Sequence, residues 1–511
     1  MTDDPQPPAG PDLVWGVPRS AFKDGKLLGH VGDDEVLLVE LNGEILAIDA
    51  HCSHYHGPLA EGIVVGDEVR CPWHHACFNL RTGEANCAPA IQPLNTWKVE
   101  IDGDTVRVKS KSGPGPMRKV NSHPDIRRIV IVGGGAAGFA AAEMLRRRGF
   151  TGDVTMLSND AATPVDRPNL SKDYLAGSAP EEWLPLQPDD FYKEKGIGLR
   201  LNTDVAAIDP AAKQVKLKSG GAVPYDRLLL ATGAEPVRPD IRGATPENLL
   251  TLRSVADCKH IIAHLGNAKR IAVLGASFIG LEVAASLRTR GLEVHVVAPE
   301  ARPMERVLGP GIGDLVRAIH EHNGVVFHLG ETVTQVNGRT VTLKSGQTLE
   351  ADFIVAGVGV RPRTTLAEQA GLKIDRGVIV DAHLQTSVPG IFAAGDIARW
   401  PDRHSGQSIR VEHWVVAERQ GQTAAINVMG EQEPYTDVPF FWSQHYDMAI
   451  NYVGHAERWD EIDVEGDIVA RDCVVKYRLG HRTLAVASIG RDLDSLYAEL
   501  ALQRGLEPGL P

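Results

Sequence analysis

The sequence predicts a multidomain protein with an N-terminal all-β domain, two α/β domains on parallel sheets, and a small C-terminal α+β domain. Within the first ~110 residues, short alternating runs such as Glu35–Leu41 and Glu44–Ile48 are separated by turn residues such as Asn42-Gly43, which is typical of β-hairpins. An apolar strand followed by an Ala-rich helix then occurs twice, beginning at Ile129 and at Ile271. Such continuous apolar strands are typical of parallel sheets that helices cover on both faces. New strand-like runs near the end of the chain predict the last domain.

Composition excludes several classes of protein. The chain has 511 residues, of which 43% are hydrophobic and 23% charged, so it is not largely disordered. Its net charge of −13 makes nucleic acid and anionic membranes poor partners. No window is long and apolar enough for a membrane span, and Met1–Pro11 lacks the regions of a signal peptide. Six cysteines are too few for a disulfide scaffold, so we expect a cytoplasmic protein.

Two short loops of the all-β domain carry potential metal ligands. Cys52-Ser-His54 and Cys71-Pro-Trp-His74 lie 19 residues apart, between predicted strands. Two cysteines and two histidines at these spacings can supply four ligands to one metal centre. Zinc accepts the same ligand set, and four unrelated loop residues are the remaining alternative.

The wider segments favour an iron–sulfur cluster. Cys52–Leu59 and Cys71–Phe78, with Thr82-Gly83 beyond, resemble the cluster loops of Rieske ferredoxins. The resemblance implies a [2Fe-2S] cluster, with one iron held by the two cysteines and the other by the two histidines. Such centres accept one electron at potentials of about −150 to +300 mV. The ligands that it implies are Cys52, His54, Cys71 and His74.

The two loops depart from the Rieske pattern at one position each. His56 and His75 stand where these loops usually carry glycine, which allows unusual backbone angles. Each ligand histidine therefore has a second histidine one or two residues away, and we assign His54 and His74 by spacing. Cys77 and Cys87 match no ligand position and are expected to be structural.

The first α/β domain begins with a nucleotide-binding motif. The segment Gly133–Gly138 follows an apolar strand and opens a helix, so its glycines permit a pyrophosphate to approach the helix N-terminus. An acid about 20 residues further on is expected to bind the ribose, and Asp160 is the candidate, with Asn159 as the alternative. The expected binding glycines are Gly133, Gly135 and Gly138.

The second α/β domain repeats this motif in altered form. The segment Gly275–Gly280 keeps its first and last glycines, Gly275 and Gly280, but has Ser277 at the middle one. Glu300 lies after the next predicted strand and would bind a ribose 2′-hydroxyl, which favours NADH. Arg302 is the alternative partner and would meet the 2′-phosphate of NADPH, which we consider the less favoured cofactor.

Further segments indicate which nucleotide belongs to which motif. Asp226–Ala234 and Ser387–Asp396 resemble the closing motifs of flavoproteins with two dinucleotide-binding domains. In that family the first glycine motif binds FAD and the second binds NAD(P)H, both in Rossmann-like domains. The resemblance implies FAD contacts from Thr232, Gly233, Gly395 and Asp396, the last to the ribitol.

One segment narrows the resemblance. Asp166–Lys172 resembles the flavin-contacting segment of oxygenase-coupled ferredoxin reductases and of apoptosis-inducing-factor-like proteins. The resemblance implies that Arg167 and Lys172 lie beside the flavin and that Lys172 pairs with Glu282, the two acting as the catalytic pair. It also implies an isoalloxazine lining formed by Glu412, His413, Trp414 and Trp442.

These resemblances give the expected domain order. The boundaries are 1–112 for the Rieske domain, 113–126 for a linker rich in Gly and Pro, 127–249 with 375–432 for the FAD-binding domain, 250–374 for the NAD(H)-binding domain, and 433–511 for the C-terminal reductase domain.

Two other patterns bear on the chemistry of the protein. The chain has no Cys-x-x-Cys pair, so disulfide reduction is disfavoured. Asp257, His260 and His264 have helical spacing and could present two imidazoles and a carboxylate to a mononuclear iron. Because they lie inside the expected nucleotide module, we expect a solvated helix face instead.

Together the modules resemble a Rieske ferredoxin fused to a ferredoxin reductase, the arrangement of the apoptosis-inducing factor 3 group. NADH delivers electrons in pairs and a Rieske cluster takes one, so the resemblance implies an enzyme that passes electrons from NADH through FAD to the cluster. The external acceptor would be an oxygenase, a cytochrome or a ferredoxin. The alternatives are an NADH-responsive redox sensor and a self-contained Rieske oxygenase. The sequence carries no signal for the oligomeric state.

Overall fold

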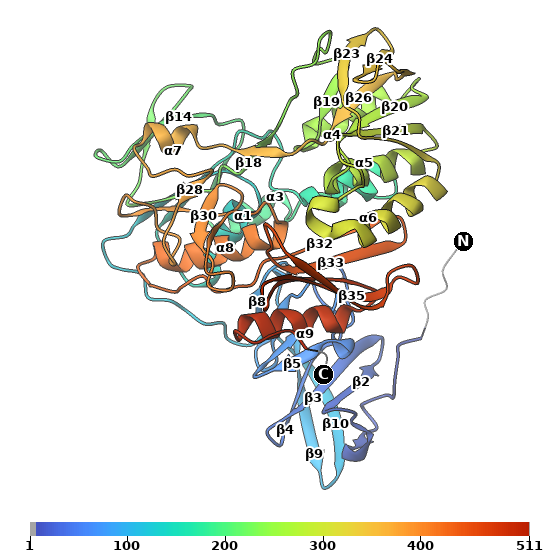
Figure 1. The fold of residues 1–511 in the computed structure, drawn as a ribbon. Coiled ribbons are helices and arrows are strands. Elements are labelled where there is room, and N and C mark those ends of the chain that lie inside the picture. Colours follow the sequence, from blue (N-terminus) through green and yellow to red (C-terminus); the bar gives the residue numbers. More distant parts are fainter. Residues whose placement is uncertain (1–6, 510–511) are drawn as a thin grey trace. The chain divides into compact units, whose positions relative to one another are not determined.

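The chain folds into two compact units, seen in a computed structural model that describes residues 7–509 (Figure 1). The N-terminal unit consists of the described parts of Met1–Val120 and Arg491–Pro511, and the central unit is Asn121–Gly490. The last helix of the chain therefore belongs with the first hundred residues. No helix among residues 7–509 is long and apolar enough to cross a membrane.

The N-terminal unit contains two antiparallel sheets and one α-helix. The helix, α9, is Asp492–Gln503. The larger sheet has the strand order β1-β10-β9-β4-β3-β2 and the smaller one β5-β6-β7-β8. The strands of the larger sheet are β1 (Val17–Pro18), β2 (Lys26–Val31), β3 (Asp34–Leu41), β4 (Glu44–Asp49), β9 (Thr96–Asp102) and β10 (Thr105–Gly113). Those of the smaller sheet are β5 (Ile63–Val65), β6 (Glu68–Arg70), β7 (Cys77–Asn79) and β8 (Ala85–Cys87).

The predicted hairpin between β3 and β4 is confirmed. Asn42 and Gly43 both have positive φ, 52° and 83°, which is the geometry of the two-residue turns that match the twist of a hairpin. Apolar side chains of these strands enter a core that also contains Cys52, Cys71 and Phe78. The expected cluster loops therefore project from a packed β framework.

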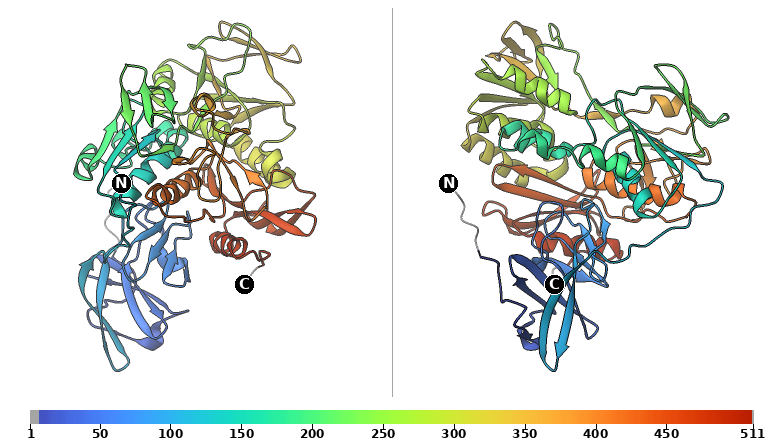
Figure 2. Two further views of the ribbon diagram at one scale, coloured as in Figure 1. Left: turned by 90° about the vertical axis from the view of Figure 1, so that its left-hand side faces the viewer. Right: turned by 180° about the vertical axis from the view of Figure 1, so that it is seen from behind.

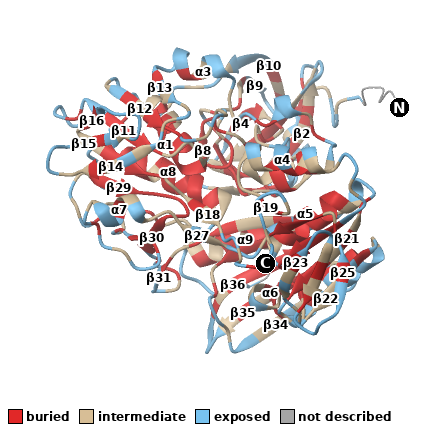
Figure 3. Ribbon diagram, turned by 90° about the horizontal axis from the view of Figure 1, so that it is seen from above, coloured by how far each residue is buried: buried red, intermediate tan, exposed pale blue. Residues whose placement is uncertain are grey.

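The first half of the central unit is built on a five-stranded parallel sheet, as predicted. Its strand order is β13-β12-β11-β17-β29. Its apolar strands are buried, and α8 is buried over most of its length (Figure 3). The strands are β11 (Arg128–Val132), β12 (Asp153–Leu157), β13 (Ile197–Arg200), β17 (Arg227–Leu230) and β29 (Ile391–Ala393), and the helices α1 (Ala136–Arg147) and α8 (Trp414–Val428).

A second five-stranded parallel sheet repeats this plan with the order β19-β26-β20-β21-β22. Its β20, like β11 in the first sheet, leads into a glycine-rich turn and a helix. The strands are β19 (Leu249–Thr251), β20 (Arg270–Leu274), β21 (Glu293–Ala298), β22 (Val325–Leu329) and β26 (Phe353–Ala356). The helices are α4 (Val255–His264), α5 (Phe278–Thr289) and α6 (Glu305–His322).

Smaller elements complete the two α/β halves. Three-stranded sheets are formed by β14 (Val205–Asp209), β15 (Gln214–Leu217) and β16 (Ala222–Pro224); by β23 (Val333–Asn337), β24 (Thr340–Leu343) and β25 (Thr348–Glu350); and by β28 (Val378–Ile379), β30 (Ala398–Pro401) and β31 (Ser408–Ile409). A pair is formed by β18 (Ala234–Pro236) and β27 (Val360–Pro362). The short helices are α2 (Asp173–Ala176), α3 (Asp189–Glu194) and α7 (Thr365–Gln369).

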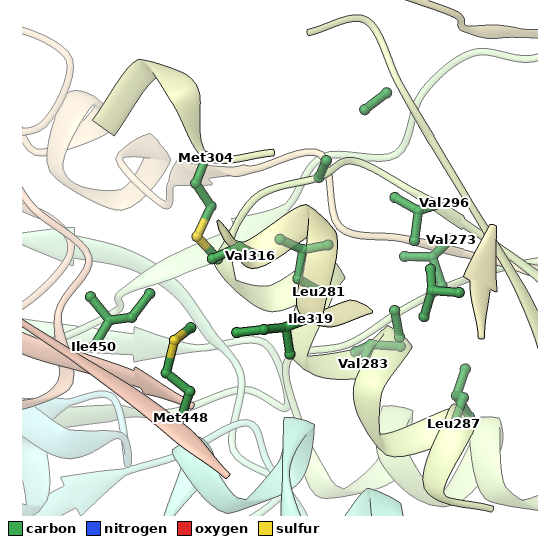
Figure 4. Close-up of a cluster of buried hydrophobic side chains, with 14 of the residues drawn as sticks. Val273, Leu281, Val283, Leu287, Val296, Met304, Val316, Ile319, Met448 and Ile450 are labelled. Carbon is green, nitrogen blue, oxygen red and sulfur yellow. The ribbon is translucent and has the colours of Figure 1, made fainter. Parts of the chain in front are cut away.

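The last part of the central unit is a five-stranded antiparallel sheet, drawn in orange to red in Figure 2, with the order β32-β33-β36-β35-β34. Its inner face and the second α/β half share one hydrophobic core, where Met448 and Ile450 lie near Leu281 of α5 and Ile319 of α6 (Figure 4). The strands are β32 (Phe440–His445), β33 (Met448–Gly454), β34 (Glu461–Asp467), β35 (Asp472–Leu479) and β36 (Arg482–Ile489).

Candidate functional site

The two expected cluster loops share one backbone plan. In the first, the N–H of Cys52 donates to the carbonyl oxygen of Gly57 at 2.9 Å. In the second, the N–H of Cys71 donates to Ala76 over the same distance. Each loop is thus a tight turn that begins at a ligand cysteine and returns five residues later.

The histidines at the usual glycine positions have left-handed backbone. His56 has a φ of 58° and His75 a φ of 60°, and the N–H of each donates to the carbonyl of the preceding ligand cysteine. This confirms that the position calls for unusual backbone angles, which a residue other than glycine adopts at a cost of about 1 kcal/mol. The side chains differ, because His56 is exposed and His75 is fully buried.

The four expected ligands converge in two pairs. Nδ1 of His54 lies 3.2 Å from Nδ1 of His74. Two imidazole nitrogens bound tetrahedrally to one metal at 2.0–2.1 Å are about 3.3 Å apart, so the spacing fits shared coordination. Burial lowers the pKa of His54 to about 4, which keeps the imidazole neutral, as a metal ligand must be.

The two cysteines are buried beside each other. The thiol of Cys52 hydrogen-bonds the sulfur of Cys71, and this lowers the pKa of Cys71. The backbone N–H of His54 also points at Sγ of Cys52, 3.5 Å away. Two soft thiol ligands on one side and two imidazoles on the other fit the ligand set of a Rieske cluster.

The first glycine-rich turn, between β11 and α1, is constrained at both ends. Gly133 has a φ of 121°, and a Cβ there would lie 2.0 Å from the carbonyl oxygen of Ala231. A Cβ on Gly138 would lie 2.0 Å from the oxygen of Gly133. Gly135 caps α1, and a Cβ there would lie nearest to the guanidinium of Arg167, at 3.4 Å. The helix N-terminus is therefore left open toward a basic group, which fits a pyrophosphate.

Arginines gather around the expected FAD contacts. Arg167 is ion-paired with Asp160 at 3.0 Å, and burial together with the neighbouring Arg253 lowers the pKa of Arg167. Arg253 donates to the carboxylate of Asp396, while its buried Nε has no hydrogen-bond partner. An orphaned guanidinium N–H in a basic cluster fits an anionic cofactor such as FAD. Sequence reasoning missed Arg253, since it lies in no recognised motif.

The predicted pair of Lys172 and Glu282 is present. Nζ of Lys172 donates to Oε2 of Glu282 at 2.8 Å, and Glu282 is only 4% exposed. The hydroxyls of Ser171 and Ser443 also donate to this carboxylate, at 2.6 and 2.7 Å. Three donors fix the position of the carboxylate and, through it, that of the lysine ammonium.

The network continues into the core. Oγ of Ser443 lies 3.2 Å from Nε2 of His445, whose Nδ1 lies 3.2 Å from Nε2 of His320. Both histidines are fully buried, and burial lowers the pKa of each to about 3, so they are neutral. Side chains alternate between the two faces of β32, so Ser443 and His445 lie on one face. This alternation is the only sequence signal that could have predicted their contact.

The second glycine-rich turn accommodates its serine. Gly275 has a φ of 99°, and a Cβ there would lie 2.4 Å from the oxygen of Gly357. Ser277 caps α5 with an ordinary φ of −103°, is exposed, and donates to the oxygen of Gly357 at 3.3 Å. The serine therefore strains nothing in the fold.

The base that follows the second turn is engaged in two ion pairs. Arg302 is held by the carboxylates of Glu305 and Asp314, at 3.1 and 2.8 Å. A guanidinium engaged by two acids is less available to a 2′-phosphate, which favours Glu300 and NADH.

The other predicted cofactor contacts lie within the central unit. The hydroxyl of Thr232 and the carbonyl of Gly233 both bond the backbone of Arg363. The N–H of Gly395 donates to Oε1 of Gln420 at 2.8 Å, while Nε2 of the buried Gln420 has no partner. Glu412 is ion-paired with Arg410, His413 packs on Phe441, Trp414 begins α8, and Trp442 lies in β32.

Helix capping explains the carboxylate in the set Asp257, His260 and His264. Asp257 accepts hydrogen bonds from the backbone of Arg253 and from the N–H and hydroxyl of Ser254, which form a capping box at the start of α4. His260 is exposed on the same helix. Asp257 and His264 are half-buried, and the solvated helix face stays a prediction.

Comparisons with known proteins match three parts of the chain to known domains. Residues 14–98 match the Rieske [2Fe-2S] domain, residues 127–421 match pyridine nucleotide-disulphide oxidoreductase, and residues 440–509 match the reductase C-terminal domain.

Relatives cover the chain to different extents. Apoptosis-inducing factor 3 of Homo sapiens is 34% identical over 482 residues, which are 91% of this chain and 79% of that protein. Rhodocoxin reductase of Rhodococcus erythropolis is 35% identical over 74% of this chain and 91% of its own. The solved complex of putidaredoxin reductase with putidaredoxin has a TM-score of 0.72 and 32% identity, and the match covers 76% of this chain and 94% of that one.

The protein is an NAD(P)H-dependent oxidoreductase whose domains imply FAD, NAD(H) and a 2Fe-2S cluster, and the residues described above fit all three. Its relatives include the rubredoxin-NAD(+) reductase of Pseudomonas putida. The chain belongs to the pyridine nucleotide-disulphide oxidoreductase family, in a form that also carries Rieske and reductase C-terminal domains.

Proposed function

We propose that the protein oxidises NADH and delivers the electrons singly, by way of its own Rieske cluster, to an external acceptor protein. The observation that carries the proposal is that one chain has both a match to the Rieske [2Fe-2S] domain, in which His54 faces His74, and the Lys172–Glu282 ion pair. The proposed acceptor class is an oxygenase, a cytochrome or a ferredoxin; one relative is named as the ferredoxin--NAD(+) reductase component of an anthranilate 1,2-dioxygenase system.

The electron count explains why the modules belong together. NADH gives up two electrons with a hydride, whereas a Rieske cluster accepts one. Bound FAD supplies the conversion between two-electron and one-electron chemistry. The contribution of this chain is to bind and orient: the N-terminus of α1 and Arg167 would bind the pyrophosphate, and His54 and His74 would hold one iron of the cluster.

Lys172 is the proposed catalytic residue beside the flavin, and Glu282 is its positioning partner. The carboxylate of Glu282 is fixed by Ser171 and Ser443, so the ammonium of Lys172 is held in one place. A fixed positive charge favours the negative charge that reduction adds to the cofactor.

An anaerobic titration with NADH, followed by visible and electron paramagnetic resonance (EPR) spectroscopy, tests the proposal. We expect the flavin absorbance to bleach and a Rieske EPR signal to appear as NADH is added. A cluster that stays oxidised while the flavin is reduced would overturn the proposed route.

Two variants sharpen this test. His74→Ala should abolish the Rieske signal while NADH still bleaches the flavin, and His56→Ala, an exposed histidine of the other loop, should retain both. Lys172→Met should slow flavin reduction about tenfold or more without loss of FAD. The matched control is Lys259→Met, because Lys259 forms a surface ion pair with Glu181.

The two alternative functions are separated by turnover and metal content. Fast, cluster-dependent reduction of an artificial one-electron acceptor supports the reductase over a redox sensor. A self-contained oxygenase requires a mononuclear iron in addition to the two cluster irons, so iron counting per chain decides. We propose a cytoplasmic setting, as expected for a chain with as few as six cysteines in 511 residues.

A further inference from the structure

The second cluster loop differs from the first in what surrounds it. The two loops have the same backbone turn, and both carry a histidine with left-handed φ. His56 of the first loop is exposed, whereas His75 of the second is 0% exposed. Since the backbone requirement is the same, the difference lies in the side-chain contacts of His75.

Those contacts come from the far end of the chain. Nδ1 of His75 donates to Oε2 of Glu499 at 2.8 Å, and Glu499, on α9, is itself 3% exposed. One turn further along α9, Oε1 of Gln503 accepts from Nη2 of Arg70 at 3.0 Å. Nη1 of Arg70 lies 3.9 Å from Glu499, so the buried carboxylate has a cation beside it.

Arg70 and His75 bracket the ligands. Arg70 ends β6 and directly precedes Cys71, while His75 directly follows His74. The helix α9 therefore contacts the residue before the ligand cysteine and the residue after the ligand histidine. An ion pair on the surface would do little to fix the loop. These groups are buried, and their hydrogen bonds are charge-assisted, so the bonds fix the geometry of the loop.

We propose that Glu499 is a positioning residue for the Rieske cluster, through which α9 fixes the second ligand loop. Glu499 orients His75, and with Gln503 it orients Arg70, so both ends of the segment Cys71–His74 are tied to one helix. The buried charges of Glu499 and Arg70 also lie next to the loop, where they tune the affinity of the cluster for an electron. The loop that carries His56 has no counterpart to this helix among the described contacts.

The test uses the full-length protein with its cluster in place and dithionite as the reductant. It therefore gives a result whether or not NADH reduces the cluster, and it does not depend on the proposed electron route. The rate of cluster loss in the presence of an iron chelator, the EPR spectrum and the midpoint potential from a dye-mediated titration are measured for each variant.

Glu499→Ala should lose its cluster about tenfold faster than wild type and show an altered EPR spectrum. Glu499→Gln keeps an acceptor for His75 and should restore the rate of cluster loss. Its midpoint potential should still rise, because a buried negative charge is removed. Arg70→Gln, which removes the positive charge, should shift the potential the other way.

Matched controls separate this role from general packing of the helix. Leu493→Ala changes an exposed side chain of α9, and His56→Gly changes the corresponding position of the first loop. Both should match wild type in all three measurements. If Glu499→Ala behaves like Leu493→Ala, the proposal is wrong.

If Glu499→Ala does not fold, the pair Glu499→Gln and Arg70→Gln decides. Shifts of the midpoint potential in opposite directions support the part of the proposal that the buried charges of Glu499 and Arg70 act on the cluster. Shifts in the same direction, or none, overturn it, since a loss of helix packing has no reason to follow the sign of the removed charge.

Discussion

The two glycine-rich turns of the central unit share a backbone and differ in what their helices carry. In both turns the first and last glycines pack against carbonyl oxygens, within 2.0 Å at Gly133 and Gly138 and within 2.4 Å at Gly275 and Gly280 if a Cβ is added. These glycines are requirements of the fold. The middle position is not, because Ser277 occupies it in the second turn without strain.

The larger difference lies two residues after each turn. In α1 this position is Ala140, and in α5 it is Glu282, and both are buried. The carboxylate of Glu282 binds Lys172 and Ser443 and continues to buried histidines. At this position one copy of the fold thus has an apolar side chain behind the expected cofactor cradle, and the other copy has a carboxylate that connects two more segments of the chain.

Exchanging the two residues tests the comparison most severely. Ala140→Glu places a carboxylate at a position that is 0% exposed. We expect the free energy of unfolding to fall by about 4 kcal/mol or more, or no folded flavoprotein to be recovered. Chemical denaturation checks this, and Ala140→Ser is the control of smaller size. A stable Ala140→Glu variant would show that α1 tolerates the charge that α5 uses.

The reverse exchange, Glu282→Ala, should lower the free energy of unfolding by a smaller amount. Glu282→Ala leaves the partly buried Lys172 without its partner, and we expect a loss of about 3 kcal/mol in chemical denaturation. Glu282→Gln, which can still accept hydrogen bonds, should lose less. Equal stability of Glu282→Ala and wild type would mean that the network does not stabilise the fold.

The histidines of the α5 network predict sensitivity to acid. His445 and His320 have a pKa of about 3 in the folded protein, below the ordinary value near 6.5, so between these values the unfolded chain binds more protons. Stability is therefore lost as the pH falls below 6.5, by about 2 kcal/mol per histidine from pH 7 to pH 5.

Thermal unfolding from pH 7 to pH 5 checks the effect. His445→Gln should show a shallower loss than wild type, and His260→Gln, an exposed histidine on α4, should not. Identical pH profiles for all three proteins would contradict buried, neutral histidines.

The middle glycine of the first turn should affect binding more than folding. Gly135→Ala adds a Cβ between the start of α1 and Arg167, and we expect FAD affinity to fall about tenfold, or about 1.4 kcal/mol. Flavin fluorescence on titration of the apoprotein measures it. The apoprotein should remain folded, unlike Gly133→Ala, which must displace the backbone of Ala231.

The smallest effect is expected at the matching serine. Ser277→Gly removes a side chain from the expected path of the second pyrophosphate, and NADH affinity should rise by about threefold or less. Quenching of protein fluorescence by NADH under anaerobic conditions checks it. A marked weakening would mean that the serine hydroxyl binds the nucleotide.

Local pattern was enough for much of the fold. The hairpin at Asn42-Gly43, the duplicated strand–turn–helix units and the unusual backbone at His56 and His75 follow from residue types in short segments. The long-range contacts do not. Glu499 and His75 are 424 positions apart, and no spacing rule relates them. Ser443 reaches Glu282 only because an antiparallel sheet near the end of the chain packs against α5.

Helix α9 belongs to the N-terminal unit, and this has a consequence for the synthesis of the protein. The N-terminal unit includes residues from both ends of the chain, so the polypeptide passes between the units twice, near Val120 and near Gly490. A ribosome completes all of the central unit before it reaches Glu499. The partner of His75 is therefore synthesised only after the whole central unit, and the surroundings of the second ligand loop are incomplete until then.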